Sequence, residues 1–184
     1  MQILKRIIIG LVSLIVILIL VSYLLPGSSV VTRSIEIKAP VNVVYAQFSD
    51  FNNWNNWSPW FRKDTTMKQT IMGAAGSGGH TLKWESTNKD LGHGSIAFDK
   101  VVQDNSIDAT LTFDDMKMQS TIMWRLEPSA TGTNITWSDS ATLGYNPMMR
   151  WMGLFMDKFM GPDFESGLKN MKAYAEKNAT ITPK

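Results

Sequence analysis

The sequence has no cysteine among its 184 residues, and its only histidines are His80 and His93. The absence of cysteine excludes disulfide bonds, thiolate nucleophiles and thiolate metal sites together. The two histidines stand in separate glycine-rich stretches, lack the fixed spacing of a metal site and have no third ligand beside them. We therefore predict no metal site and no cofactor.

Complete nucleotide-binding motifs are also missing. In the stretch GAAGSGGHT, Gly73 and Gly78 have the spacing of a phosphate-binding loop, but Gly79 and His80 stand where that loop requires Lys and Ser or Thr. The dinucleotide-binding pattern G-x-G-x-x-G is absent from the sequence. We interpret the glycine-rich stretch as a hairpin loop.

A strong excess of charge is missing as well. The formal net charge is +2, from 18 basic and 16 acidic residues. Lys5 and Arg6 account for that excess, because the other 16 basic residues balance the 16 acidic ones. Binding to nucleic acid usually requires a basic stripe, so we predict no nucleic-acid partner.

One long hydrophobic run is present near the N-terminus. Residues 7–25 read IIIGLVSLIVILILVSYLL and carry no charge. As a helix, this run spans about 28 Å, close to the hydrocarbon thickness of a bilayer. Lys5 and Arg6 precede it, so the positive-inside rule predicts a cytoplasmic N-terminus over residues 1–6. We expect a single-pass anchor in the cytoplasmic (inner) membrane, with the following domain outside, in a periplasm where one exists.

A cleaved signal peptide is the alternative interpretation of this run. Its apolar core is usually shorter and ends in small residues, whereas the exit here reads SYLLPGSS, a poor cleavage site. We therefore favour a retained transmembrane helix over 7–25. Residues 26–30 then form a short linker, which keeps the folded domain close to the bilayer.

Alternating apolar and polar residues predict a set of β-strands after this linker. The stretch VVTRSIEIKAP indicates a first strand, and Pro40 fits the first turn of a short helix. Six further strands are expected at 67–72, 81–86, 95–102, 106–113, 119–127 and 134–143. Their spacing is typical of an antiparallel meander.

The C-terminal part is predicted to be helical from Pro147 to Lys177. A break or kink is expected at Gly161–Pro162, because proline lacks a backbone donor. Segregation of the strands from this helix indicates an α+β fold, with a curved antiparallel sheet around a long C-terminal helix. Residues 179–184 are expected to be a flexible tail.

Four stretches of the sequence carry a family resemblance. IKAPVNVVYAQFSDFNNWNNWSPW, GSGGHTLKWES, TGTNITWSDS and MDKFMGPDFESGLKNMKAYAE together resemble the polyketide cyclase/dehydratase-like branch of the START-related SRPBCC superfamily. The resemblance implies the helix-grip fold, in which a cavity lies between the sheet and the C-terminal helix. It also implies an apolar or amphipathic ligand. We assign residues 31–178 to such a START-like domain, preceded by the transmembrane helix.

Two aromatic and sulfur-rich segments could contact a ligand. Trp54, Trp57 and Trp60 recur at a spacing of three, and core packing, the rim of a cavity and membrane contact are three competing interpretations. Methionines concentrate in the segment 148–160, where they are either core filler or part of a mobile lid that covers the cavity or dips toward lipid.

Strand parity selects the residues expected to face inward and contact a ligand. Two tryptophans and two methionines from the segments above are added to them, and the full set is Trp57, Trp60, Leu82, Trp84, Ile96, Phe98, Leu111, Ile122, Trp124, Ile135, Trp137, Met152 and Met156. Parity alone does not separate cavity wall from filled core.

A complete catalytic constellation is not recognisable. Glu85, Asp99 and Asp139 are possible acids, but Glu85 alternates with Trp84 and is expected to face outward. We therefore assign no catalytic residue and favour a binding protein over an enzyme.

The predicted function is a membrane-anchored binding protein for a hydrophobic small molecule or lipid, held between the sheet and the C-terminal helix. An enzyme of the cyclase or dehydratase type is one alternative. A partner-binding envelope module with a filled core is the other.

Overall fold

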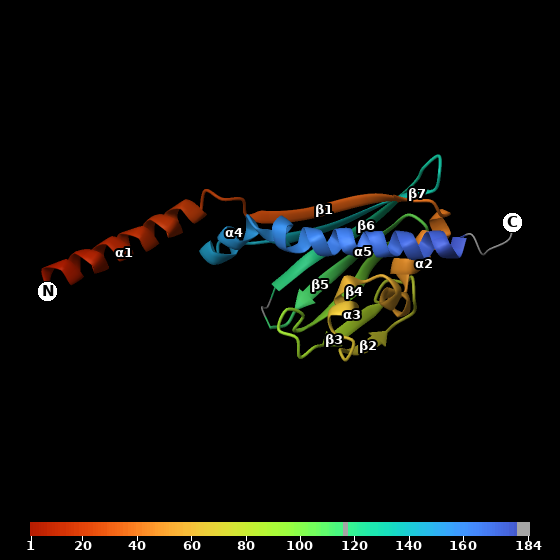
Figure 1. Cartoon of the computed structure of the whole chain (residues 1–184), viewed down its shortest axis with the longest axis horizontal. Coiled ribbons are helices and arrows are strands. Elements are labelled where there is room, and N and C mark those ends of the chain that lie inside the picture. The colour runs from red at the N-terminus through yellow and green to blue at the C-terminus, as the bar shows by residue number, and fades with distance from the viewer. Residues whose placement is uncertain (116–117, 180–184) are drawn as a thin grey trace.

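A long apolar helix is followed by a curved antiparallel sheet, and the C-terminal helix lies across that sheet (Figure 1). The computed structural model describes residues 1–115 and 118–179. The helices are α1 (Gln2–Ser22), α2 (Val41–Ser49), the 3-10 helix η1 (Phe51–Asn56), α3 (Pro59–Lys63), α4 (Pro147–Gly153) and α5 (Met156–Ala179). The strands are β1 (Ser28–Ile37), β2 (Lys68–Met72), β3 (Thr81–Glu85), β4 (His93–Val102), β5 (Ser106–Phe113), β6 (Met118–Pro128) and β7 (Thr133–Thr142).

The strands form one sheet in the order β1-β7-β6-β5-β4-β3-β2, and all neighbours are antiparallel. β2 to β7 follow one another as a meander, and β1 pairs with β7 at the edge. Figure 1 shows α5 along the face of this sheet. The arrangement confirms the predicted α+β helix-grip fold.

Period-two alternation separates a buried concave face of the sheet from a polar convex face. On β5, Ile107, Ala109 and Leu111 are buried, while Asp108 and Thr110 between them point the other way and are half-exposed. Such alternation is expected where one face of an antiparallel sheet packs on a core and the other meets water. The concave face therefore holds both the core and the candidate site.

An aromatic cluster joins this concave face to α5. Trp137 of β7 stacks on Phe164 of α5 with ring centroids 4.1 Å apart, and its register partner Trp124 on β6 lies at 5.8 Å. A Cβ at Gly167 would lie 3.1 Å from the Trp137 ring and 3.2 Å from Pro59. Any larger residue would crowd these rings, so glycine lets α5 approach the sheet closely there.

The C-terminal helix does not break at Gly161–Pro162, so the prediction is wrong on this point. α5 runs through this pair, and the chain instead leaves the helix at Leu154–Phe155, between α4 and α5. A proline inside a helix costs about 3 kcal/mol locally. Here Gly161 packs against Arg33 of β1 and Phe164 is fully buried, so tertiary packing offsets that cost.

The N-terminal helix α1 starts before the predicted span and ends at Ser22, so Tyr23–Leu25 lie beyond it. In the described part of the chain it is the one helix long and apolar enough to cross a membrane, and the rest of the protein does not cover it. Five residues, Tyr23–Gly27, connect it to β1, which begins inside the predicted linker. The predicted flexible tail beyond Ala179 lies outside the described residues.

Candidate functional site

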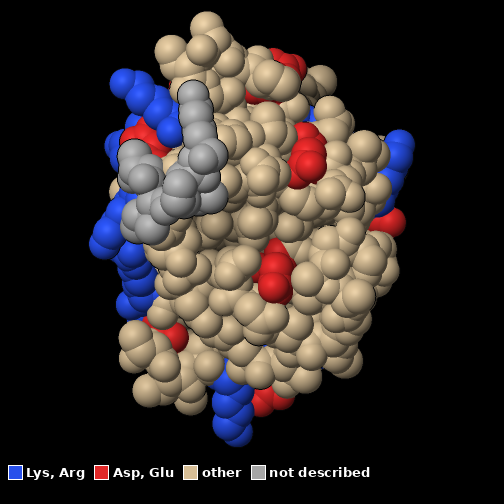
Figure 2. All heavy atoms as spheres, turned by 90° about the vertical axis from the view of Figure 1, so that its right-hand side faces the viewer, with Lys and Arg blue, Asp and Glu red and all other residues tan. Residues whose placement is uncertain are grey.

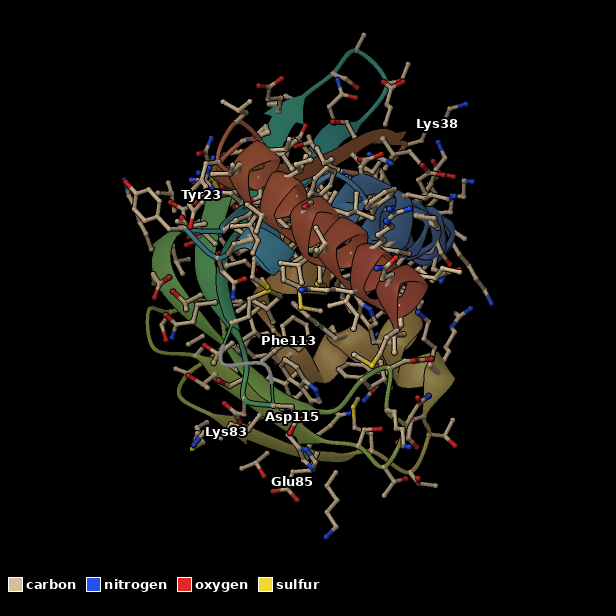
Figure 3. All side chains as sticks on the ribbon, turned by 90° about the vertical axis from the view of Figure 1, so that its left-hand side faces the viewer. Tyr23, Lys38, Lys83, Glu85, Phe113 and Asp115 are labelled. Atoms are coloured by element: carbon tan, nitrogen blue, oxygen red, sulfur yellow. The ribbon has the colours of Figure 1, made fainter. Side chains whose placement is uncertain are left out.

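A cavity of about 760 Å³ lies between the concave face of the sheet and helices α3, α4 and α5. Its wall is mostly apolar, and its size falls in the range of about 300–1,000 Å³ that is usual for small-molecule sites. Figure 3, viewed from the end that carries α1, shows the cavity-lining Phe113 toward the middle of the molecule, with Lys83 and Glu85 at the outer edge. Part of the space between the sheet and the helices is therefore a cavity, beside a filled core.

Most of the inward candidates selected by parity come together on the cavity wall. The strands contribute Leu82, Trp84, Ile96, Leu111, Ile122, Trp124 and Trp137, and the helices contribute Trp60, Met152 and Met156. Their placement makes ligand contact possible, and that contact remains a proposal.

Three candidates lie in the filled core instead. Phe98 is buried against Phe51, with ring centroids 4.6 Å apart, and Ile135 is completely buried on β7. Trp57 is also completely buried, and its indole Nε1–H donates to the carbonyl of Gln47. Parity assigns a face of the sheet correctly but does not say how far along a strand the cavity extends.

Further lining residues were not selected from the sequence. They are Trp54, Phe61, Lys63, Met67, Asp90, Leu91, Phe113, Met118, Leu143, Met149, Gly153, Phe159, Met160 and Asp163. Continuing the parity of Leu111 by one step would have found Phe113, and continuing that of Trp137 by three steps would have found Leu143. Leu91 stands in a connecting segment, where no periodic pattern marks a residue as inward, and Met67 lies just before β2 although a strand was expected from residue 67.

The methionine-rich segment forms one side of the cavity. Met149, Met152, Met156 and Met160 line it from α4 and the first turns of α5. Methionine side chains are flexible and adapt to varied apolar shapes. This placement is compatible with the predicted lid.

The three tryptophans that follow α2 divide between core and cavity. Trp54 and Trp57 are buried, and Trp54 donates its Nε1–H to the Phe48 carbonyl at the end of α2. Trp60 is half-buried, lines the cavity and meets Trp137 edge-on at 5.5 Å. Core packing therefore accounts for Trp57, whereas Trp54 and Trp60 belong to the wall.

A few charged side chains stand on the wall among these apolar groups. The ammonium of Lys63 on α3 lies 2.7 Å from the carboxylate of Asp163 on α5, and both residues line the cavity. Asp90, in the loop between β3 and β4, is the third. The Lys63–Asp163 pair is partly exposed, so it adds a polar element to an otherwise mostly apolar wall.

Asp139 is a buried acid on the cavity side of β7. It is 5% exposed, it shares its face with Trp137 and it pairs in register with Ile122, and both of these residues line the cavity. Its Oδ1 has no hydrogen-bond partner among the described residues. Burial raises its pKa to about 6, because the charged form is poorly solvated there, and the neighbouring Ser120 hydroxyl opposes this only in part. Such a carboxyl can hold a proton near neutral pH.

The other titratable candidates lie away from the cavity. His80 is buried, stacks on Phe51 at 4.6 Å and accepts the Phe51 backbone N–H at Nε2, so its role is structural. His93 is exposed beside Asp115, and Asp99 accepts a hydrogen bond from Thr110 on the convex face. Among the described residues, no group of three potential metal ligands occurs.

The glycine-rich loop has no phosphate-binding geometry. It joins β2 to the strand β3, whereas a phosphate-binding loop opens a helix. Gly73, Gly76 and Gly79 adopt positive φ angles, and the backbone N–H of Gly79 donates to the Phe98 carbonyl. These glycines shape a tight connection.

A curved antiparallel sheet that grips a C-terminal helix places this protein in the helix-grip class of α+β domains. Residues 29–176 match the family model described as polyketide cyclase / dehydrase and lipid transport. The match spans most of the chain, so this protein belongs to that family. The sequence has no significant match among curated proteins.

Solved structures share the fold at low sequence identity. A protein of unknown function from Staphylococcus aureus is 15% identical, with a TM-score of 0.64 over 84% of this chain and 97% of its own. An uncharacterised protein from Rhizobium leguminosarum is 14% identical, with a TM-score of 0.61 over 82% and 95%. The di-domain ARO/CYC StfQ from the steffimycin biosynthetic pathway is 13% identical, with a TM-score of 0.65 over 83% of this chain and 52% of StfQ. At these identities the likeness concerns the fold alone.

Proposed function

We propose that this protein is a membrane-anchored binding protein whose cavity holds a hydrophobic small molecule or a lipid. The apolar cavity of about 760 Å³ is the observation that carries the proposal. Family membership supports it, because the family description includes lipid transport. The hollow interior counts against the alternative of a partner-binding module with a filled core.

The apolar helix α1 supports the anchored arrangement. Its surface is uncovered by the rest of the protein, so lipid is a suitable environment for it. Lys5 and Arg6, near its start, favour a cytoplasmic N-terminus, with the cavity-bearing domain on the other side of the cytoplasmic membrane.

Native mass spectrometry of the full chain, released from polymer-bounded membrane discs, tests binding. The wild type is expected to carry a co-purifying apolar molecule. Met152→Trp combined with Met156→Trp fills the cavity from the helix side and should abolish that added mass. Met123→Trp places the same new side chain on the convex face and should leave it unchanged. A wild-type chain without any guest, after offering several lipids, would refute the proposal.

An enzyme of the cyclase or dehydratase type is the second candidate, favoured by the buried Asp139. Asp139 does not itself line the cavity, but its protonated carboxyl lies beside the lining residues Ile122 and Trp137 and could serve as a general acid toward a guest that reaches it. If so, Asp139→Asn should retain the guest but leave it chemically unchanged, whereas the wild type should convert it. Comparing the guest's mass between the two proteins separates a carrier from an enzyme.

A further inference from the structure

Side chains of α4, which borders the cavity, form hydrogen bonds with the C-terminal part of the apolar helix α1 and the residues after it. The indole Nε1–H of Trp151 donates to the carbonyl of Leu18 at 3.2 Å. The guanidinium of Arg150 donates to the carbonyls of Tyr23 and Leu25, both at 3.1 Å. A cation favourably meets the carbonyls at a helix C-terminus. These contacts fix α4 beside the last turn of α1.

The position of Leu18 shows where α4 lies along the axis of α1. Leu18 lies four residues before the last residue of α1, which is about 6 Å along the helix axis. Trp151 therefore lies alongside α1 rather than beyond its end. If α1 crosses a bilayer, Trp151 and Arg150 reach the interfacial layer, where tryptophan is enriched and long basic side chains extend toward water.

A patch of exposed apolar side chains surrounds this junction. We call it the mouth patch and define it as Met148, Met152, Leu154, Phe155 and Phe159, which are 71%, 38%, 49%, 51% and 65% exposed. The rings of Phe155 and Phe159 lie 6.4 Å apart, so they form a continuous surface. Exposed apolar groups gathered in this way mark an interaction surface.

The mouth patch is continuous with the cavity wall. Met152 and Phe159 are exposed and also line the cavity. Gly153, the last residue of α4, lines it too, and a Cβ there would meet the Leu143 side chain. The cavity therefore reaches the surface at the end of the molecule that carries α1. Figure 3 shows this end, with Tyr23 close to the junction.

The end of the molecule opposite to α1 presents charged side chains on its surface (Figure 2). Figure 2 shows acidic side chains spread across that end, with Lys and Arg side chains mostly along its edges. A lipid surface would be a poor partner for such a face, since charged groups are costly in hydrocarbon. The apolar exposure at the α1 end thus coincides with the place where an anchored domain would meet the bilayer.

We propose that the mouth patch lies in the outer leaflet of the membrane that α1 crosses, and that the cavity takes an amphipathic lipid directly from that leaflet. The inference rests on the proposed function. Its occupant is a lipid surface rather than a protein, because the patch continues from α1 through α4 to the cavity. A lipid would then pass from the bilayer to the cavity without exposing its chains to water.

The absence of cysteine makes a depth measurement direct. Single variants Phe155→Cys and Phe159→Cys, each labelled with an environment-sensitive fluorophore, are reconstituted as full chains in vesicles of phosphatidylethanolamine and phosphatidylglycerol. Leu14→Cys in α1 is the control for insertion. Val102→Cys is the matched control, because Val102 is an exposed apolar residue. It lies at the end of β4 opposite to Gly94, which pairs with Phe113 of β5. Doxyl-labelled lipids then quench whichever labels lie in lipid.

Quenching at positions 14, 155 and 159, but not at 102, supports the inference. Quenching at 14 without quenching at 155 and 159 overturns the inference and leaves the anchor in place. Absence of quenching at 14 refutes the anchor together with the inference.

The route of lipid entry is tested with Phe155→Asp, because Phe155 belongs to the mouth patch but does not line the cavity. Uptake of a fluorescent phospholipid from vesicles should slow by about tenfold or more, since a carboxylate is costly in the apolar layer. Loading from detergent, and uptake by Val102→Asp, should match the wild type. An unchanged rate from vesicles would overturn the proposed route, and loss of loading from both sources would contradict the proposal that Phe155 acts only at entry.

Discussion

Asp139 should make the stability of the domain depend on pH. Its pKa rises from an ordinary value of 3.8 to about 6 because the carboxyl is buried on β7. A difference of about two pKa units corresponds to about 3 kcal/mol. Since the folded pKa lies above the unfolded one, unfolding releases a proton between these values. The stabilising contribution is complete below pH 3.8 and is lost as the pH rises through about 6.

The test compares the wild type with Asp139→Asn, which has nearly the same shape but does not titrate. Between pH 5 and pH 8 the wild type should lose about 1.4 kcal/mol relative to the variant. For a domain of this size that is roughly 3–6 °C in Tm. Thermal unfolding of the full chain in detergent, followed by tryptophan fluorescence, measures the difference at each pH.

Parallel stability curves for the two proteins would refute the reasoning. They would mean that Asp139 remains solvated or finds a partner that stabilises its charge. Glu127→Gln, at an exposed position on β6, is a matched control that should not change the pH dependence.

Three further predictions concern packing and can be checked by thermal or chemical unfolding. Gly161→Ala should destabilise the protein by up to about 1 kcal/mol, because its Cβ would displace the Arg33 guanidinium from its ion pairs with Asp157 and Glu165. In an Arg33→Ala background the same change should stabilise it by up to about 1 kcal/mol, as alanine favours helix, and a loss in both backgrounds would contradict the steric cause. His80→Ala should cost about 2–3 kcal/mol through its buried hydrogen bonds, whereas the exposed His93→Ala should stay within about 0.5 kcal/mol. Equal effects at both histidines would contradict a structural role for His80. Trp137→Ala should cost about 3–5 kcal/mol, and a loss below about 1 kcal/mol would show that its aromatic contacts are dispensable.

Strand periodicity predicted the sheet well because one of its faces is buried throughout. The run 106–113 matches β5, and the parity of Leu82, Ile122 and Trp137 placed them on the inner face. Parity does not locate the cavity along a strand, so Phe98 was grouped with them although it packs in the filled core. That distinction depends on which helices cover each part of the sheet, and the local sequence does not record it.

The helical tail and the buried acid show a second limit. Local propensity favoured a break at Gly161–Pro162, but α5 is continuous there, and Arg33 of β1 forms ion pairs with Asp157 and Glu165 on either side of this pair. Asp139 shares parity with Trp137, so its inward direction was readable from the sequence. Its degree of burial was not, because burial depends on how closely α5 and the neighbouring strands approach.

The short connection Tyr23–Gly27 limits where an anchored domain can act. Five extended residues reach only about 17 Å, and the contacts of Arg150 and Trp151 with α1 shorten this range further. Such a protein diffuses in two dimensions and cannot ferry cargo across an aqueous gap to a second membrane. Any molecule that it binds would have to be transferred to an acceptor that comes to the same membrane surface.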